Sequence, residues 1–200
     1  MPRLFRALVP AFALVAVIAA PAGARTGDPL AVVASFNAAL VDVMRQGKAL
    51  GLKGRYAKLA PLVRQTHDMT EMTRLVVGPS WSTIAPPDRA VLVAAFTRHS
   101  VLAYATNFAS FDGERFTLTP TPETRGGDVL VRGAIVGRDG STALNYRMRN
   151  EADGWRIVDV YADGISQVAV QRSEFAATLK LGGAPALTAK LTALDDAKLK

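Results

Sequence analysis

The hydrophobic period of this chain changes at Asp112-Gly113, and this change constrains the fold more than any other feature. Before it, apolar residues recur at the spacing of α-helices, whereas after it apolar and polar residues alternate as in half-buried β-strands. Helical spacing returns after Arg172. The alternating segments cover residues 115–121, 129–136, 141–149 and 154–166. This order predicts an α+β fold, in which helices pack on one face of a strongly twisted, four-stranded antiparallel sheet.

Start and stop signals place helices on both sides of the sheet. Asp28 and Asp68 are suited to cap the first and third helices, and Pro61 should bend or split the second. Gly182-Gly183 should separate the last two. The predicted helices cover residues 29–45, 53–66, 69–77, 86–110, 172–181 and 184–198.

The longest predicted helix carries an aromatic line at i+4 spacing. Its members are Leu92, Phe96, Ser100, Tyr104 and Phe108. Such a line is typical of ordinary core, and it also suits the wall of an apolar ligand site. Spacing alone does not separate these two interpretations.

The first residues predict export from the cytoplasm. Arg3 and Arg6 precede an apolar run over residues 7–20, and Ala22-Gly23-Ala24 offers a small-x-small cleavage site. The run is short for a membrane span, which needs about 20 residues, so a cleaved signal peptide is favoured over an uncleaved anchor. We therefore expect a signal peptide at residues 1–24, a mature domain at residues 25–200 and a periplasmic location.

The amino-acid composition limits the kinds of molecule that the protein is expected to bind. The chain has no Cys, so it has neither disulfides nor a lipid-attachment cysteine. It holds 24 Lys and Arg against 17 Asp and Glu, and loss of the signal peptide leaves 22 against 17. This mild excess suits an anionic membrane surface or lipid headgroup. Nucleic acid is disfavoured because there is no basic run with interleaved aromatic residues.

Few residues offer chemistry. The chain lacks a nucleophile elbow, a phosphate loop and any His or Cys pair at metal-ligand spacing, so we expect no metal and no cofactor. One alternative function uses the residues that are left. It is a small exported enzyme with a cone-shaped fold, in which His99 or Asp159 would be the catalytic acid or base. Arg55, Arg64 and Arg74 could meet a phosphate near a pocket mouth, or could simply form a solvated helix face.

Several short motifs, read in order, resemble one family. They are Arg55-Tyr56-x-x-Leu59-x-Pro61, His67-Asp68-Met69, Met72-x-Arg74, Val77-Gly78-x-x-Trp81, Phe96, Tyr104-Ala105-x-x-Phe108, Phe111-x-Gly113-Glu114-x-Phe116, Trp155-Arg156-Ile157-Val158-Asp159-Val160, Gly164-Ile165-Ser166 and Arg172-Ser173-Glu174-Phe175. This series resembles the toluene-tolerance family, the periplasmic phospholipid-binding proteins of the Mla lipid-transport pathway. It covers nearly the whole mature chain.

The last two motifs resemble the hopanoid-biosynthesis-associated branch of that family. The chain departs from the family pattern at three places: His67 stands where Phe is common, Asp163 where Glu is common, and Gln171 where the family has Tyr. These departures affect the choice of lipid rather than the fold.

The resemblance implies that residues 25–200 form a lipid-binding domain with an apolar cavity between the helices and the sheet. Acyl chains would lie inside this cavity, and the headgroup would stay near its mouth. It also implies a carrier, without enzyme activity, that shuttles phospholipid or a hopanoid-type lipid between an inner-membrane ABC-type permease complex and an outer-membrane lipoprotein complex. Two alternatives stay open: the cone-fold enzyme with Asp159 or His99, and a non-catalytic subunit whose groove binds a protein segment.

Inward-facing positions supply the candidate site residues. For the lipid pocket they are Leu75, Val76, Trp81, Phe96, Tyr104, Phe108, Val131, Leu144, Tyr146, Val160 and Ile165; for the headgroup they are Arg55 and Arg74. Some of the apolar candidates are expected to be ordinary core, because core and pocket share the same residue types.

Overall fold

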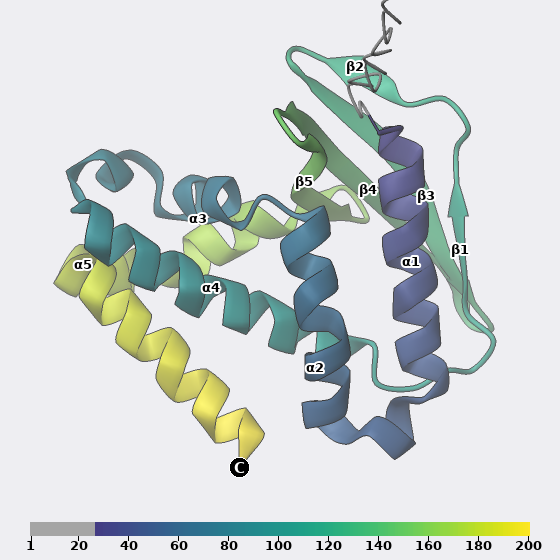
Figure 1. Ribbon diagram of the computed structural model, residues 1–200, viewed down its shortest axis with the longest axis horizontal. Coiled ribbons are helices and arrows are strands. Elements are labelled where there is room, and N and C mark those ends of the chain that lie inside the picture. Colours follow the sequence, from purple (N-terminus) through teal and green to yellow (C-terminus); the bar gives the residue numbers. More distant parts are fainter. Residues whose placement is uncertain (1–26) are drawn as a thin grey trace, which may run out of the picture.

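A computed structural model describes residues 27–200 and is shown in Figure 1. The predicted signal peptide at residues 1–24 lies outside the described residues. The helices are α1 (Pro29–Arg45), α2 (Gly47–Thr66), α3 (Met69–Val77), a short 3₁₀ helix η1 (Gly78–Thr83), α4 (Pro86–Asn107) and α5 (Gln167–Leu199).

The predicted caps are present. The Asp28 side chain accepts a hydrogen bond from the backbone N–H of Leu30, and the Asp68 side chain accepts one from that of Glu71. Each cap satisfies an N–H group that the first helical turn leaves without a partner. The segment from the end of α2 to α3 is also tied to the sheet, because the backbone N–H of Asp68 donates to the carbonyl of Ile157 at 3.0 Å.

Helix α2 differs from its prediction at two points. It begins six residues earlier, with a kink at Gly51, whose φ of 59° is in the region that glycine adopts without strain. Pro61 neither splits it nor takes the backbone out of helical angles. The neighbouring Leu59 and Val63 are fully buried, and their packing compensates for the backbone hydrogen bond that proline cannot make. The last two predicted helices form α5, which kinks at Gly182 and Gly183.

The strands form one antiparallel sheet. They are β1 (Arg115–Leu118), β2 (Glu123–Arg125), β3 (Asp128–Gly137), β4 (Gly140–Glu151), β5 (Gly154–Ala162) and β6 (Ile165–Ser166). Neighbours follow the order β1-β3-β4-β5-β6, and β2 pairs with β3 beside β1. The four predicted strands are therefore present, and two short ones accompany them.

The strand predicted over residues 154–166 is in fact a hairpin. Asp163 and Gly164 have φ values of 48° and 83°, which reverse the chain between β5 and β6. Further along the sheet, the register between β4 and β5 shifts between Arg147 and Met148, so that one extra residue on β5 forms a bulge. A bulge of this kind bends the strand and increases its twist.

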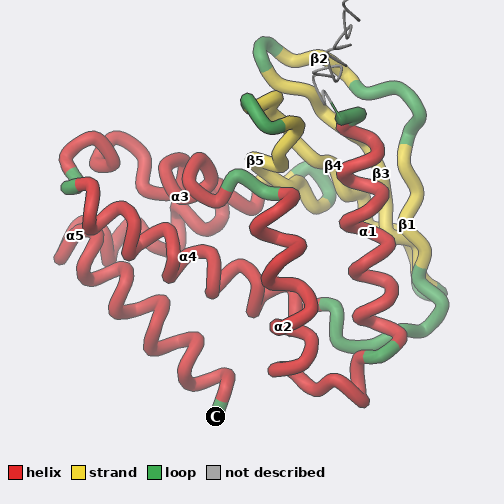
Figure 2. Tube along the Cα trace, viewed as in Figure 1, coloured by secondary structure: helices red, strands yellow, loops and turns green. Residues whose placement is uncertain are grey.

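Helices cover one face of this twisted sheet, as Figure 2 shows. Helix α1 runs along the sheet, while α2, α3, α4 and α5 form a helical half beside it (Figure 1). The core lies where the two halves meet: Phe36 and Leu40 of α1 are buried with Met148 and Ile157 of the sheet. The predicted α+β class is confirmed. None of the helices within residues 27–200 combines the length and apolar character of a membrane span.

Candidate functional site

An apolar cavity of about 210 Å³ lies between α4 and the sheet. Its floor comes from β4 and β5, and its other walls come from α1, α3, α4 and the start of α5. The lining residues are Phe36, Leu40, Met72, Ser100, Ala103, Tyr104, Asn107, Phe108, Leu144, Tyr146, Val160, Ala162, Gln167 and Gln171. None of these side chains is charged.

The cavity has an apolar end and a polar end. Phe36, Leu40 and Met72 at the apolar end are buried, whereas Asn107 and Gln167 are exposed and Gln171 is half-buried. The carboxamide side chains therefore mark the mouth, where the end of α4 meets the start of α5. An apolar cavity with a few polar groups at one end is the usual form of a binding site for an apolar molecule.

Tyr104 forms one wall of the cavity and bonds to the protein behind it. Its hydroxyl lies 3.0 Å from Nε2 of His67, whose Nδ1 lies 2.9 Å from the Thr66 hydroxyl. That hydroxyl already donates to the carbonyl of Leu62, so Nδ1 of His67 must be the donor to it. Nε2 is then an acceptor, and Tyr104 donates its proton to it.

Burial keeps His67 neutral. Removal from water lowers the pKa of His67 to about 3. Burial also raises the pKa of Tyr104, so the pair holds no charge at neutral pH. The contacts of His67 with Thr66, with Tyr104 and with the edge of the Phe36 ring 4.9 Å away are those of a structural histidine.

Tyr146 resembles Tyr104 in this respect. Its ring lines the cavity from β4, and its hydroxyl donates to Oδ1 of Asn37 on α1 at 2.7 Å. Burial raises its pKa as well. Both tyrosines therefore present rings to the cavity while their hydroxyl protons are taken up by the protein. The wall stays apolar even though two of its residues carry polar groups.

Five of the predicted pocket residues line this cavity. They are Tyr104, Phe108, Leu144, Tyr146 and Val160. Phe96, Val76 and Val131 are fully buried core residues instead, and Leu75 and Trp81 pack partly buried against the core. Ile165 lies outside the cavity, because the β5–β6 turn leaves it 59% exposed.

The sequence interpretation missed nine lining residues. Phe36 and Leu40 belong to the apolar stripe of the first helix and were expected to be core. Ser100 lies on the aromatic line of α4, so its position on that line was a usable signal. Asn107 and Gln167 gave no pattern, because polar residues near helix ends are usually solvated. Gln171 had a signal as a departure from the family pattern, although it was not predicted to line the pocket. Met72, Ala103 and Ala162 complete the set.

The two predicted headgroup residues are not among those that line the cavity. Arg55 is buried and donates to the backbone carbonyls of Ala105 and Gly47, both at 2.7 Å. It thus holds the start of α2 against the end of α4. Arg74 pairs with Glu71 on its own helix at 2.5 and 2.7 Å. Arg64, the third arginine considered, is exposed on α2.

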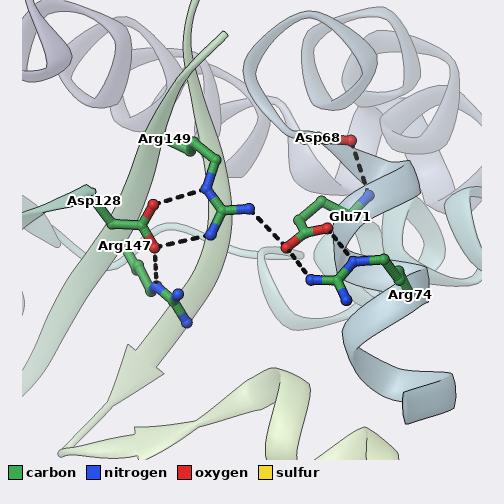
Figure 3. Close-up of polar contacts among 6 residues, drawn as sticks. All are labelled: Asp68, Glu71, Arg74, Asp128, Arg147 and Arg149. Atoms are coloured by element: carbon green, nitrogen blue, oxygen red, sulfur yellow. Dashed lines mark hydrogen bonds and ion pairs between the residues drawn. The ribbon is translucent and has the colours of Figure 1, made fainter. Parts of the chain in front are cut away.

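Arg74 belongs to an ionic network that joins α3 to the sheet (Figure 3). Arg149 of β4 donates to Asp128 of β3 at 2.7 and 3.1 Å and to Glu71 of α3 at 2.7 Å, while Arg147 donates to Asp128 at 2.5 Å. Hydrogen bonds from Arg74 hold the pKa of Glu71 below its usual value, and those from Arg149 do the same for the pKa of Asp128. The network is structural, since each arginine has a carboxylate partner.

Both acid–base candidates lie outside the cavity. Asp159 accepts hydrogen bonds from the Ser166 hydroxyl at 2.6 Å and the backbone N–H of Val168 at 3.2 Å, so it caps the start of α5. His99 bonds through Nδ1 to Asp195 at 2.8 Å and holds the last part of α5 on α4. No cluster of three metal-ligating side chains occurs within residues 27–200.

Comparison with known proteins gives two findings. The model of a family described as MlaC protein matches residues 35–193. The fold is also similar to that of a phospholipid-binding protein from Ralstonia solanacearum, solved in complex with a phospholipid. The two chains share 20% identity and have a TM-score of 0.76, over 87% of this chain and 100% of the other. At this identity, the likeness shows a shared fold.

Proposed function

The chain belongs to the MlaC protein family, and on that premise we propose that it binds phospholipid by enclosing acyl chain in the cavity between α4 and the sheet. The family match confirms the resemblance drawn from the sequence motifs. The observation that carries the proposal is the cavity itself: an uncharged, mainly apolar space with a carboxamide-lined mouth. The structural neighbour from Ralstonia solanacearum, which holds a phospholipid in the same fold, supports it.

The energetics favour a cavity without special chemistry. Each methylene group exposed to water costs about 0.8 kcal/mol, so an acyl chain cannot leave a bilayer without an apolar shelter. A carrier needs only to match the environment of the bilayer, and strong headgroup contacts would slow release. The uncharged lining fits this requirement.

The cavity as it stands is smaller than the ~300–1,000 Å³ of common ligand pockets. Its 210 Å³ accommodates part of one acyl chain. We therefore expect the walls to move apart on binding. The aromatic side chains Tyr104, Phe108 and Phe116, with ring centroids 6.1 Å apart from one to the next, extend from the cavity toward β1 and lie where such widening would continue it.

We further propose that the protein works in the periplasm as a carrier and not as an enzyme. After cleavage of a signal peptide, it would shuttle lipid between an inner-membrane ABC-type permease complex and an outer-membrane lipoprotein complex. The mild positive charge supports contact with anionic membranes. A hopanoid-type lipid remains the alternative cargo, since the last two sequence motifs resemble that branch.

The positions of two residues weigh against an enzyme. Asp159 caps a helix and His99 holds α5, so neither reaches the cavity where a substrate would lie. The closed apolar end of the cavity likewise disfavours a groove for an extended protein segment.

Lipid extraction and mass spectrometry of the purified protein test the proposal. We expect near-stoichiometric phospholipid, or a hopanoid-type lipid if the alternative cargo is correct. A protein that carries no lipid, and that takes none from vesicles of bacterial phospholipid, would contradict it.

A further inference from the structure

The hydrogen-bond donors that a bound lipid could meet are few. Tyr104 and Tyr146 already donate to His67 and Asn37. Besides them, the polar side chains that line the cavity are Ser100, Asn107, Gln167 and Gln171. Gln167 donates to the carbonyl of Ile165 at 3.2 Å. Within the described residues, the Ser100 hydroxyl and the carboxamides of Asn107 and Gln171 have no hydrogen-bond partner. Ser100 is buried, so the two carboxamides are the free donors at the mouth.

The start of α5 is not an anion site, although it lies at the mouth. A free helix N-terminus attracts phosphate through its unpaired N–H groups. Here the N–H of Val168 donates to Asp159, and the N–H of Ala169 donates to the Ser166 hydroxyl. The carboxylate of Asp159 also places a negative charge there. The donors left at the mouth are therefore neutral side-chain amides.

We propose that Gln171 and Asn107 donate hydrogen bonds to the ester carbonyl oxygens of a diacyl lipid whose chain fills the apolar end of the cavity. The inference rests on the proposed function. The ester carbonyl carbon is the first carbon of an acyl chain, so a chain that enters the cavity brings its carbonyl to the mouth. A carbonyl oxygen only accepts hydrogen bonds, and a carboxamide N–H is a matching donor.

The phosphate of such a lipid lies further out, where no lining residue carries a charge to meet it. The residues at the mouth therefore recognise the ester linkage of the lipid and not the charge of its headgroup.

A comparison of ester and ether lipids tests this inference. Diacyl phosphatidylcholine and its dialkyl ether analogue, with equal chain lengths, differ only in the ester carbonyls. Uptake of each from vesicles by the full mature protein gives the two affinities. Because one neutral hydrogen bond changes affinity by about fivefold, we expect the wild type to bind the ester lipid about fivefold or more tightly than the ether lipid.

Two single variants and their combination test whether Asn107 and Gln171 cause the preference for the ester lipid. Gln171→Leu and Asn107→Leu should each reduce the ester preference, and the double variant should remove it while retaining uptake of the ether lipid. Gln65→Leu makes the same replacement at an exposed site on α2, outside the cavity lining, and should keep the wild-type preference.

Equal affinity of the wild type for the two lipids would overturn the inference without any variant. So would an ester preference that persists in the folded double variant. Uptake of both lipids with equal affinity leaves the proposed function standing, whereas uptake of neither lipid by the wild type would overturn the proposed function and the inference with it.

Discussion

Two tyrosines at the cavity wall illustrate how single residues make a site apolar. Tyr104 and Tyr146 each have a hydroxyl group that would be costly to leave unpaired beside an acyl chain. Each donates its proton to a buried acceptor, His67 or Asn37. A sequence predicts the rings from their spacing, but it does not predict the acceptors, because those are contributed by α1 and by the junction of α2 and α3.

Introduction of a charge into the cavity tests its role. Val160 lies on β5 and lines the cavity, whereas Val170 lies on α5 and is 44% exposed. We expect Val160→Asp to reduce lipid uptake from vesicles at least tenfold, because an unpaired carboxylate in an apolar site is costly. Val170→Asp, the matched control, should retain uptake. A folded Val160→Asp protein with normal uptake would contradict the assignment of the cavity.

The burial of His67 predicts that the stability of the protein depends on pH. The unfolded chain binds a proton at His67 below its ordinary pKa of 6.5, but the folded protein does not until about pH 3. This contribution to stability is thus present above pH 6.5 and is lost as the pH falls. Between pH 6.5 and pH 5 the free energy of unfolding should drop by about 2 kcal/mol from this group.

Urea denaturation of the wild type and of His67→Gln at several pH values measures this drop. The variant cannot titrate at residue 67, so its stability should fall less over the same interval. Parallel curves for the two proteins would show that the burial of His67 has no such effect.

At the scale of elements, α4 shows what periodicity can and cannot reveal. The line from Leu92 to Phe108 was correctly predicted as one inward face. Its first half, Leu92 and Phe96, is core, and its second half, from Ser100 onward, borders the cavity. Both halves have helical spacing and apolar residues, so the sequence does not mark the point where the helix begins to border a space. The position of the sheet opposite α4 determines where that point lies.

The arginines show the same limit for charged residues. Arg55 and Arg74 were predicted at the mouth, and the structure instead uses them to join elements: Arg55 joins α2 to α4, and Arg74 belongs to the network on α3. Arg55 bonds to backbone carbonyls, which no sequence pattern identifies. Glu71 and Arg74 have i,i+3 spacing on α3, and this spacing was a usable signal for their ion pair. The short strands β2 and β6 were missed for a related reason, since three- and two-residue strands carry no measurable period.

Arg149 is the residue that links α3 to the sheet, which gives an element-scale prediction. Its removal breaks hydrogen bonds to both Asp128 and Glu71. We expect Arg149→Ala to lower the free energy of unfolding by about 1–3 kcal/mol, the usual range for hydrogen bonds between charged groups. Arg125→Ala, at a site 64% exposed, should cost about 0–1 kcal/mol. Equal losses in urea denaturation would show that the network does not hold α3.

For the whole molecule, the cavity couples lipid binding to stability. A ligand that binds only the folded protein raises the free energy of unfolding, by about 2.7 kcal/mol when its concentration is 100 times the dissociation constant. We expect removal of bound lipid to lower the melting temperature, and reloading from vesicles to restore it. Val160→Asp should show no such restoration, and an unchanged melting temperature in the wild type would contradict binding within the fold.

The central claim is that acyl chain lies between α4 and the sheet, and photocrosslinking tests it most directly. The protein is loaded with a phospholipid that carries a diazirine near the end of an acyl chain, and the labelled residues are mapped by mass spectrometry after irradiation. We expect labels at the apolar end of the cavity, on Phe36, Leu40, Tyr146 or their neighbours. Labels confined to outer residues such as Val91 and Leu181, which are 57% and 89% exposed, would contradict the account.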